Sequence, residues 1–179
     1  GRALANLLFG DVSPSGKLPV TFYRTADLLP DIHDYSMKGR TYRYCTDENV
    51  LYPFGHGLSY TTFKYGKAAL SSKEMSDNGT ITVTVPVINT GDVDGKETVQ
   101  LYIQDEKSSL PRPVKELKGF RKIHLAPGQT TEVSFSITPD DLKFFDDSKH
   151  EWIAEPGKFK AMIGASSTDI RSTVRFSYK

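Results

Sequence analysis

The feature that most constrains this chain is an alternation of apolar and polar residues that begins near residue 61. Between Ile81 and Val87 every second residue is apolar, and threonines occupy most of the positions between. Such a period of two places apolar side chains on one face of a strand and polar side chains on the other. The same pattern recurs at residues 99–104, 133–137, 159–163 and 174–178. These stretches are predicted to be half-buried antiparallel strands, with Gln100, Tyr102 and Gln104 pointing outward.

Turn signals separate the predicted strands. Gly91–Gly95 joins two of them, and Ala126–Gly128 and Glu155–Lys158 each place Pro before Gly, which is the preference of a type II turn. Thr138–Asp141 is typical of a capped first turn of a very short helix. About seven strands over about 115 residues predict a two-sheet antiparallel sandwich of the immunoglobulin or fibronectin type. Cys45 is the only cysteine, so the Cys…Trp…Cys signature is missing and the fibronectin-like branch is favoured.

The leading residues follow another pattern. Residues 2–9 have helical apolar spacing, and Gly10 stands where a left-handed residue ends a helix. Lys17–Phe22 is predicted to be a short edge strand, since two prolines lie nearby. A helix end and one strand cannot bury an apolar face by themselves. We therefore expect residues 1–22 to be the tail of an α/β domain whose remainder precedes Gly1.

Residues 23–60 are predicted to form an extended connector, and residues 61–179 the sandwich. Gly and Ser do not dominate the connector, so it lacks the composition of a flexible linker. It is rich in aromatic residues, namely Tyr35, Tyr42, Tyr44, Tyr52, Phe54 and Tyr60. Rings in this number are expected to pack against other parts of the protein rather than remain in water.

Composition excludes several classes of partner. The net charge is +1 and the basic residues are scattered, which argues against nucleic acid as a partner. No apolar run approaches the roughly 18 residues of a membrane span, so no membrane is expected. One cysteine leaves the redox compartment open. The first residues lack the order of regions that marks a signal peptide.

No arrangement of residues predicts catalysis, a metal site or a cofactor in this chain. The pairs Asp140/Asp141 and Asp146/Asp147 are adjacent, so they point to opposite faces and are assigned to turns and caps. Asp27, Asp31 and Asp34 lack the spacing of a calcium loop. The four histidines stand at no metal-ligand spacing to one another or to Cys45.

Seven residues are candidates for contact with a neighbouring domain or a ligand: Arg40, Tyr42, Arg43, Tyr44, Tyr52, Phe54 and Trp152. The phrase Arg40–Tyr44 could hydrogen-bond a ligand, or clamp the carboxylates of a neighbouring domain. Trp152 could be a platform on which a sugar stacks, or it could pack at a sheet edge. Tyr52 and Phe54 lie in a bend rich in Pro and Gly.

Several phrases resemble glycoside hydrolase family 3. Those that resemble the end of its second, α/β-sandwich domain are Ala3–Asp11 and Pro14–Pro19. Those similar to its connector are Gly39–Tyr44 and Tyr52–Tyr60. Those similar to its closing fibronectin type III-like domain are Asn89–Gly91, Gly95–Tyr102 and Leu117–Phe120. The resemblance covers essentially the whole chain, in the family's order.

The resemblance implies a retaining β-glycosidase, such as a β-glucosidase or β-xylosidase, whose catalytic residues lie upstream of Gly1. The family's nucleophile is an aspartate in a Ser-Asp-Trp setting, whereas the only tryptophan here, Trp152, follows Glu151. One hypothesis is a non-catalytic module that docks on and stabilises the upstream catalytic domains. The alternative is a module that binds oligo- or polysaccharide near them. A periplasmic or extracellular location is implied by the family alone.

Overall fold

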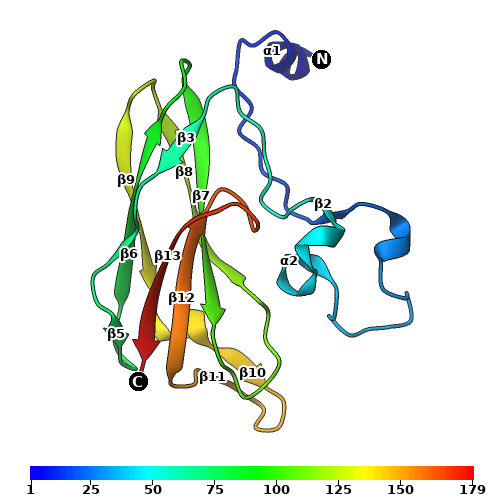
Figure 1. Ribbon diagram of the computed structural model, residues 1–179, viewed down its shortest axis with the longest axis vertical. Coiled ribbons are helices and arrows are strands. Elements are labelled where there is room, and N and C mark those ends of the chain that lie inside the picture. The colour runs from blue at the N-terminus through cyan, green and yellow to red at the C-terminus, as the bar shows by residue number, and fades with distance from the viewer.

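A computed structural model describes all 179 residues as a β-sandwich with a long N-terminal segment, residues 1–60, beside it (Figure 1). The helices are α1 (Arg2–Leu8), α2 (Thr41–Tyr44) and the 3-10 turns η1 (Ala26–Leu28), η2 (Asp47–Asn49) and η3 (Pro139–Leu142). The first strands are β1 (Phe22–Tyr23), β2 (Val50–Tyr52), β3 (Phe63–Tyr65), β4 (Ala69–Leu70), β5 (Glu74–Met75), β6 (Ile81–Asn89) and β7 (Gly95–Asp105). The others are β8 (Glu116–Leu125), β9 (Thr130–Ile137), β10 (Phe144–Asp146), β11 (Glu151–Ile153), β12 (Gly157–Gly164) and β13 (Ile170–Tyr178).

Two sheets form the sandwich and confirm the predicted fold class. One sheet has the order β5-β13-β12-β7-β8, antiparallel except where β5 joins β13. In the other, β6 pairs with β9 along one edge and with β3 and β4 along the opposite edge. Two short antiparallel pairs, β1–β2 and β10–β11, lie outside these sheets.

The core lies between the two sheets and belongs to the sandwich alone. It is a cluster of 19 buried hydrophobic residues, of which Tyr65 is the first and Tyr178 the last. The alternating residues from Ile81 to Val87 are in it and are almost completely buried, as predicted. Removal of apolar surface from water is the main stabilising term, so the sandwich carries its own source of stability.

On β7 the two faces alternate as predicted, but the predicted exposure of the outer face is wrong. Gln100 and Tyr102 were expected to face water, but they are only 3% and 0% exposed. The reason is tertiary: the connector runs over the outer face of this strand, and Tyr42 packs edge-on against Tyr102. β7 is therefore buried on both faces, which an alternation pattern cannot predict.

Some of the turn predictions are confirmed, and one is wrong. Gly10 and Gly128 have φ of 83° and 72°, so both adopt the left-handed conformation predicted for them. The capped short helix predicted at Thr138–Asp141 is η3, and the structure adds a capping box between Thr138 and Asp141. Glu155–Lys158 is not a type II turn, because Gly157 has no positive φ and already begins β12.

The prediction of a strand over Lys17–Phe22 is wrong except at its last residue. Only Phe22 and Tyr23 form β1, which pairs with β2. Leu18 does exchange backbone hydrogen bonds with Gly55 and His56, both of 2.8 Å. Pro19 follows and has no N–H to donate, so the ladder stops there.

Candidate docking surface

The N-terminal segment exposes most of the large hydrophobic side chains that face water in this chain. They are Leu4, Leu8, Phe9, Val12, Val20, Phe22, Leu28, Leu29, Ile32, Tyr35, Met37, Leu51, Tyr52, Leu58 and Tyr60. Helix α1 has no buried residue, and Phe9 after it is 85% exposed. An exposed apolar surface of this extent is typical of an interaction site.

A groove of about 860 Å³ runs between the first residues and the connector. Its apolar lining includes Leu7, Val12, Leu18, Phe22 and Leu58. No residue of the sandwich lines this groove. Helix α1, at the top of the molecule, lies apart from the two sheets (Figure 1). We call residues 1–22 with this groove the docking surface.

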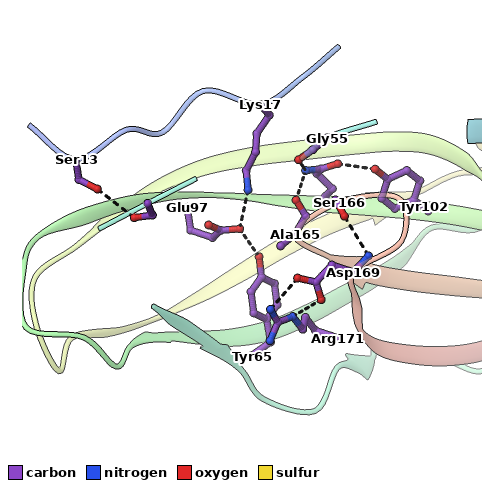
Figure 2. A network of polar contacts seen from close by, with 12 residues as sticks. Ser13, Lys17, Gly55, Tyr65, Glu97, Tyr102, Ala165, Ser166, Asp169 and Arg171 are labelled. Atoms are coloured by element: carbon purple, nitrogen blue, oxygen red, sulfur yellow. Dashed lines mark hydrogen bonds and ion pairs between the residues drawn. The ribbon is translucent and has the colours of Figure 1, made fainter. Parts of the chain in front are cut away.

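The docking surface is held to the sandwich by a buried carboxylate. Lys17 Nζ lies 3.4 Å from Oε1 of Glu97 on β7, and the Tyr65 hydroxyl donates to the same oxygen at 2.9 Å (Figure 2). Glu97 is 6% exposed. Burial raises the pKa of Glu97, and the Lys17 ammonium and the Tyr65 hydroxyl act in the opposite direction. Lys17 therefore supplies the charge that a buried carboxylate requires.

A second anchor is the amide of Gln100. Its Nε2 donates to the carbonyl oxygens of Gly55 at 3.2 Å and Ala165 at 2.7 Å, and its Oε1 accepts from the Tyr102 hydroxyl (Figure 2). A Cβ on Gly55 would lie 2.2 Å from Gln100 Oε1, and Gly55 has φ of 80°. Only glycine permits this approach and this conformation. Gln100 thus joins the connector, β7 and the β12–β13 loop.

Tyr42 provides the third anchor and brings two of the candidate residues together. Its ring stacks on Phe54 with centroids 4.4 Å apart, and it meets the Tyr102 ring edge-on at 5.8 Å. Its hydroxyl accepts a hydrogen bond of 3.0 Å from the backbone N–H of Leu117 on β8. Aromatic pairs of this geometry add about 0.5–1.5 kcal/mol to the burial of their area.

Arg40, Arg43 and Tyr44 do not converge on one site. The Arg40 guanidinium donates to the carbonyl oxygens of Ser36, Asp31 and Asp34. Arg43 Nη2 lies 3.7 Å from Oε1 of Glu116 on β8. Tyr44 is half-buried.

Tyr52 and Trp152 lie far apart in the molecule. Tyr52 lines the groove and packs against the rings of Phe22 and His56, with centroids at 6.4 and 5.4 Å. Trp152 is on the β10–β11 hairpin at the end of the sandwich remote from α1 (Figure 1). It is 65% exposed and lies edge-on to Phe145, its cross-strand partner, at 5.7 Å.

The remaining polar residues have local structural roles. Asp141 caps η3, and Asp146 accepts hydrogen bonds from the backbone and hydroxyl of Ser148. The hydroxyl's hydrogen bond lowers the pKa of Asp146. No three His, Cys, Asp or Glu residues are grouped so that they could hold a metal ion. None of the helices has the length and apolar character needed to cross a membrane.

Sequence reasoning missed Lys17, Tyr65, Glu97 and Gln100 as anchors. One signal was available for Glu97, because it stands two residues before Val99 and therefore on the core face of β7. A buried carboxylate requires a hydrogen-bond donor or a positive charge beside it. Here Lys17 and Tyr65 supply these groups from positions that are distant in the sequence. Gln100 gave no such signal, since an outward Gln is ordinary on a strand.

Comparison with known proteins identifies both parts. Residues 1–60 match the Glycosyl hydrolase family 3 C-terminal domain, and residues 97–167 match the Fibronectin type III-like domain. A β-glucosidase of Bacteroides ovatus, BoGH3A, is 48% identical over 99% of this chain and 26% of its own length. A xylan 1,4-β-xylosidase of Xylanibacter ruminicola is 44% identical over 94% and 19%, and a periplasmic β-glucosidase of Salmonella typhimurium is 44% identical over 96% and 24%.

A solved structure agrees along the whole chain. The β-glucosidase of Kluyveromyces marxianus superposes with a TM-score of 0.88 at 35% identity, over 100% of this chain and 22% of that one. The chain spans about a fifth to a quarter of the length of these relatives. It therefore belongs to glycoside hydrolase family 3, as a C-terminal part that joins the end of one domain to a fibronectin type III-like sandwich.

Proposed function

We propose that this chain is a non-catalytic C-terminal module that docks, through its docking surface, on the catalytic part of a β-glycosidase and stabilises it. One observation carries the proposal: residues 1–60 contribute nothing to the core cluster, yet expose most of the large apolar side chains. A surface of this kind is stable in water when another apolar surface covers it. The partner is the preceding part of the same polypeptide.

The proposal divides the chain into three parts: a domain tail over 1–22, a connector over 23–60 and the sandwich over 61–179. The names of the relatives favour a β-glucosidase or β-xylosidase as the whole protein. Retaining enzymes of this kind use two carboxyl groups about 5–5.5 Å apart. The paired aspartates here are occupied by caps and turns, so we assign catalysis to the preceding part. The Salmonella relative favours a periplasmic location.

A dye that binds exposed apolar surface tests the docking proposal. We expect the isolated 179-residue chain to increase the dye's fluorescence strongly, and the full-length polypeptide to do so much less. The variant Phe9→Ser should reduce binding by the isolated chain, because Phe9 is 85% exposed. The matched control is Phe159→Leu, which changes a buried ring. Equal fluorescence from the isolated chain and the full-length polypeptide would disprove the proposal.

A second candidate function is carbohydrate binding by the β10–β11 hairpin. The favouring observation is the exposed pair of Trp152 and Phe145, whose rings lie on the same face of the hairpin. An exposed aromatic ring can stack on the apolar face of a sugar. The Arg40–Tyr44 phrase is less suited, since Arg40 is engaged by carbonyl groups of its own loop.

Calorimetry distinguishes the two candidates. Xylan and glucan oligomers should release measurable heat with the chain if the hairpin binds sugar, and Trp152→Ala should abolish it. Leu110→Ala is a control, because Leu110 is an exposed apolar residue outside the hairpin. No heat with the unaltered chain would leave docking as the one function.

A further inference from the structure

The loop over residues 24–40 exposes two large apolar side chains almost completely. Ile32 is 82% and Tyr35 is 93% exposed. The loop projects from the connector away from the sandwich (Figure 1). It therefore adds a second apolar surface to the docking surface, at a different place on the N-terminal segment.

The loop is held in shape by its own hydrogen bonds. Arg40 crosses it and donates to three of its carbonyl groups, at Asp31, Asp34 and Ser36. Asp31 Oδ1 accepts from the backbone of His33 at 2.7 Å, and Asp34 Oδ1 accepts from that of Ser36 at 2.8 Å. The latter bond holds the pKa of Asp34 below its usual value. Carboxylates and guanidinium are thus used internally.

The two ends of the loop are tied to the connector. The Tyr23 hydroxyl donates to the carbonyl oxygen of Gly39 at 2.9 Å and accepts from the backbone N–H of Thr41 at 3.2 Å. The backbone N–H of Arg24 donates to Asn49 at 3.1 Å. The ends of the loop are thus joined, and surface loops held on a fixed scaffold frequently carry binding functions. Because the loop is already ordered before a partner binds, binding loses less conformational entropy, which favours affinity.

We propose that Ile32 and Tyr35 form a preformed contact with the preceding part of the same polypeptide, separate from the contact made by α1. This inference rests on the proposed function. Tyrosine is enriched among the residues that dominate binding energy at interfaces. The partner surface is therefore an apolar patch that covers Ile32 and Tyr35.

The structure favours this occupant over the alternatives. The relatives are about four times as long as this chain, so a preceding partner is present at the high effective concentration of a linked segment. The loop also adjoins the docking surface, since Val20 lines one groove of about 640 Å³ together with Leu29, Met37 and Arg40. Sugar is disfavoured, because Ile32 has no ring to stack and Arg40 is engaged within the loop.

Proteolysis tests the proposal in the full-length polypeptide. Chymotrypsin should cut after Tyr35 at least ~10-fold more slowly in the full-length protein than in the 179-residue chain, since cleavage requires local opening. The double variant Ile32→Ser, Tyr35→Ser should lower the unfolding midpoint of the full-length protein by several degrees. It should leave that of the 179-residue chain unchanged, because both side chains are exposed there.

Controls separate this inference from the docking proposal. Phe9→Ser tests docking through α1, and Leu110→Ser is a matched exposed change on the sandwich that should have no effect on either protein. If Phe9→Ser destabilises the full-length protein but the loop variant does not, docking stands and the loop contact is disproved. Equal destabilisation of the 179-residue chain, or its self-association through the loop, would also overturn the proposal.

Discussion

The two regions of this molecule are ordered in different ways. The sandwich buries a cluster of 19 hydrophobic residues between two sheets. The N-terminal segment contributes no residue to that cluster. It is held to the sandwich by a few polar contacts: Lys17 with Glu97, the Gly55 carbonyl with the Gln100 amide, and the Tyr42 hydroxyl with the Leu117 N–H. Apolar residues in the sandwich stabilise it from within, whereas most large apolar residues of the segment are exposed to water. The number of apolar residues in a region therefore does not indicate how much that region contributes to the stability of the fold.

The largest expected effect is a loss of stability caused by a change in the core of the sandwich. Phe159→Ala should lower the free energy of unfolding by about 3–5 kcal/mol, because it opens a cavity at a ring that stacks on Phe176. Urea unfolding measures it. Phe9→Ala in the same chain should change stability by less than ~0.5 kcal/mol. Similar losses from the two changes would contradict the contrast between the regions.

The next effect separates the segment from the sandwich. Gln100→Leu leaves the carbonyl groups of Gly55 and Ala165 without their donor, at a cost of about 1–3 kcal/mol. Hydrogen exchange should quicken at the amides of Gly55 and Ser167, which bond Leu18 and Phe54, before it does in β6. Gln104→Leu, the same change on the same strand, is the control. Uniform acceleration throughout the chain would argue against a separable segment.

A smaller expected effect is a dependence of folding stability on pH. The pKa of Glu97 is raised in the folded protein, so its contribution to stability is present below its ordinary pKa and is lost as pH rises through the raised value. Glu97→Gln should remove this dependence. Lys17→Met should raise the pKa of Glu97 further and extend the loss to higher pH. An NMR titration of the Glu97 carboxyl measures both, and an unchanged pKa in Lys17→Met would show that the anchor carries no charge coupling.

The smallest effect concerns an exposed ion pair on the sandwich. Lys179 and Glu74 lie 2.9 Å apart, and both side chains are more than half exposed. Glu74→Gln should change stability by less than ~0.5 kcal/mol, because water and salt screen such a pair. Thermal unfolding at low and high salt checks this. A larger loss would mean that polar contacts stabilise the sandwich as they do the segment.

The sequence predicts those parts of the fold that local rules govern. The alternation at Ile81–Val87, the left-handed Gly128 and the capped short helix at Thr138 each depend on neighbours in sequence. The errors at Gln100 and Tyr102 arose because distant residues cover them. The strand predicted over Lys17–Phe22 was wrong because Pro19 cannot donate.

Residue type predicts only some of the contacts that form the candidate site. Tyr42 and Phe54 were chosen as aromatic residues of the connector, and they stack on each other. Arg40 was chosen for an outside partner, but it donates to its own loop. Lys17 and Glu97 are 80 positions apart, so their pairing depends on how the chain folds and no local pattern indicates it.

The burial of β7 on both faces has a consequence for shortening this protein. A chain cut to start near Phe63 would keep every core residue and should still fold. It would lose the third layer formed by Tyr42, Phe54 and Gly55, and leave the Gln100 amide and the Tyr102 ring exposed on a strip of the sheet. Such a strip invites sheet-to-sheet stacking between molecules. The connector, which contributes nothing to the core cluster, thus covers a face of the sandwich that would otherwise be exposed.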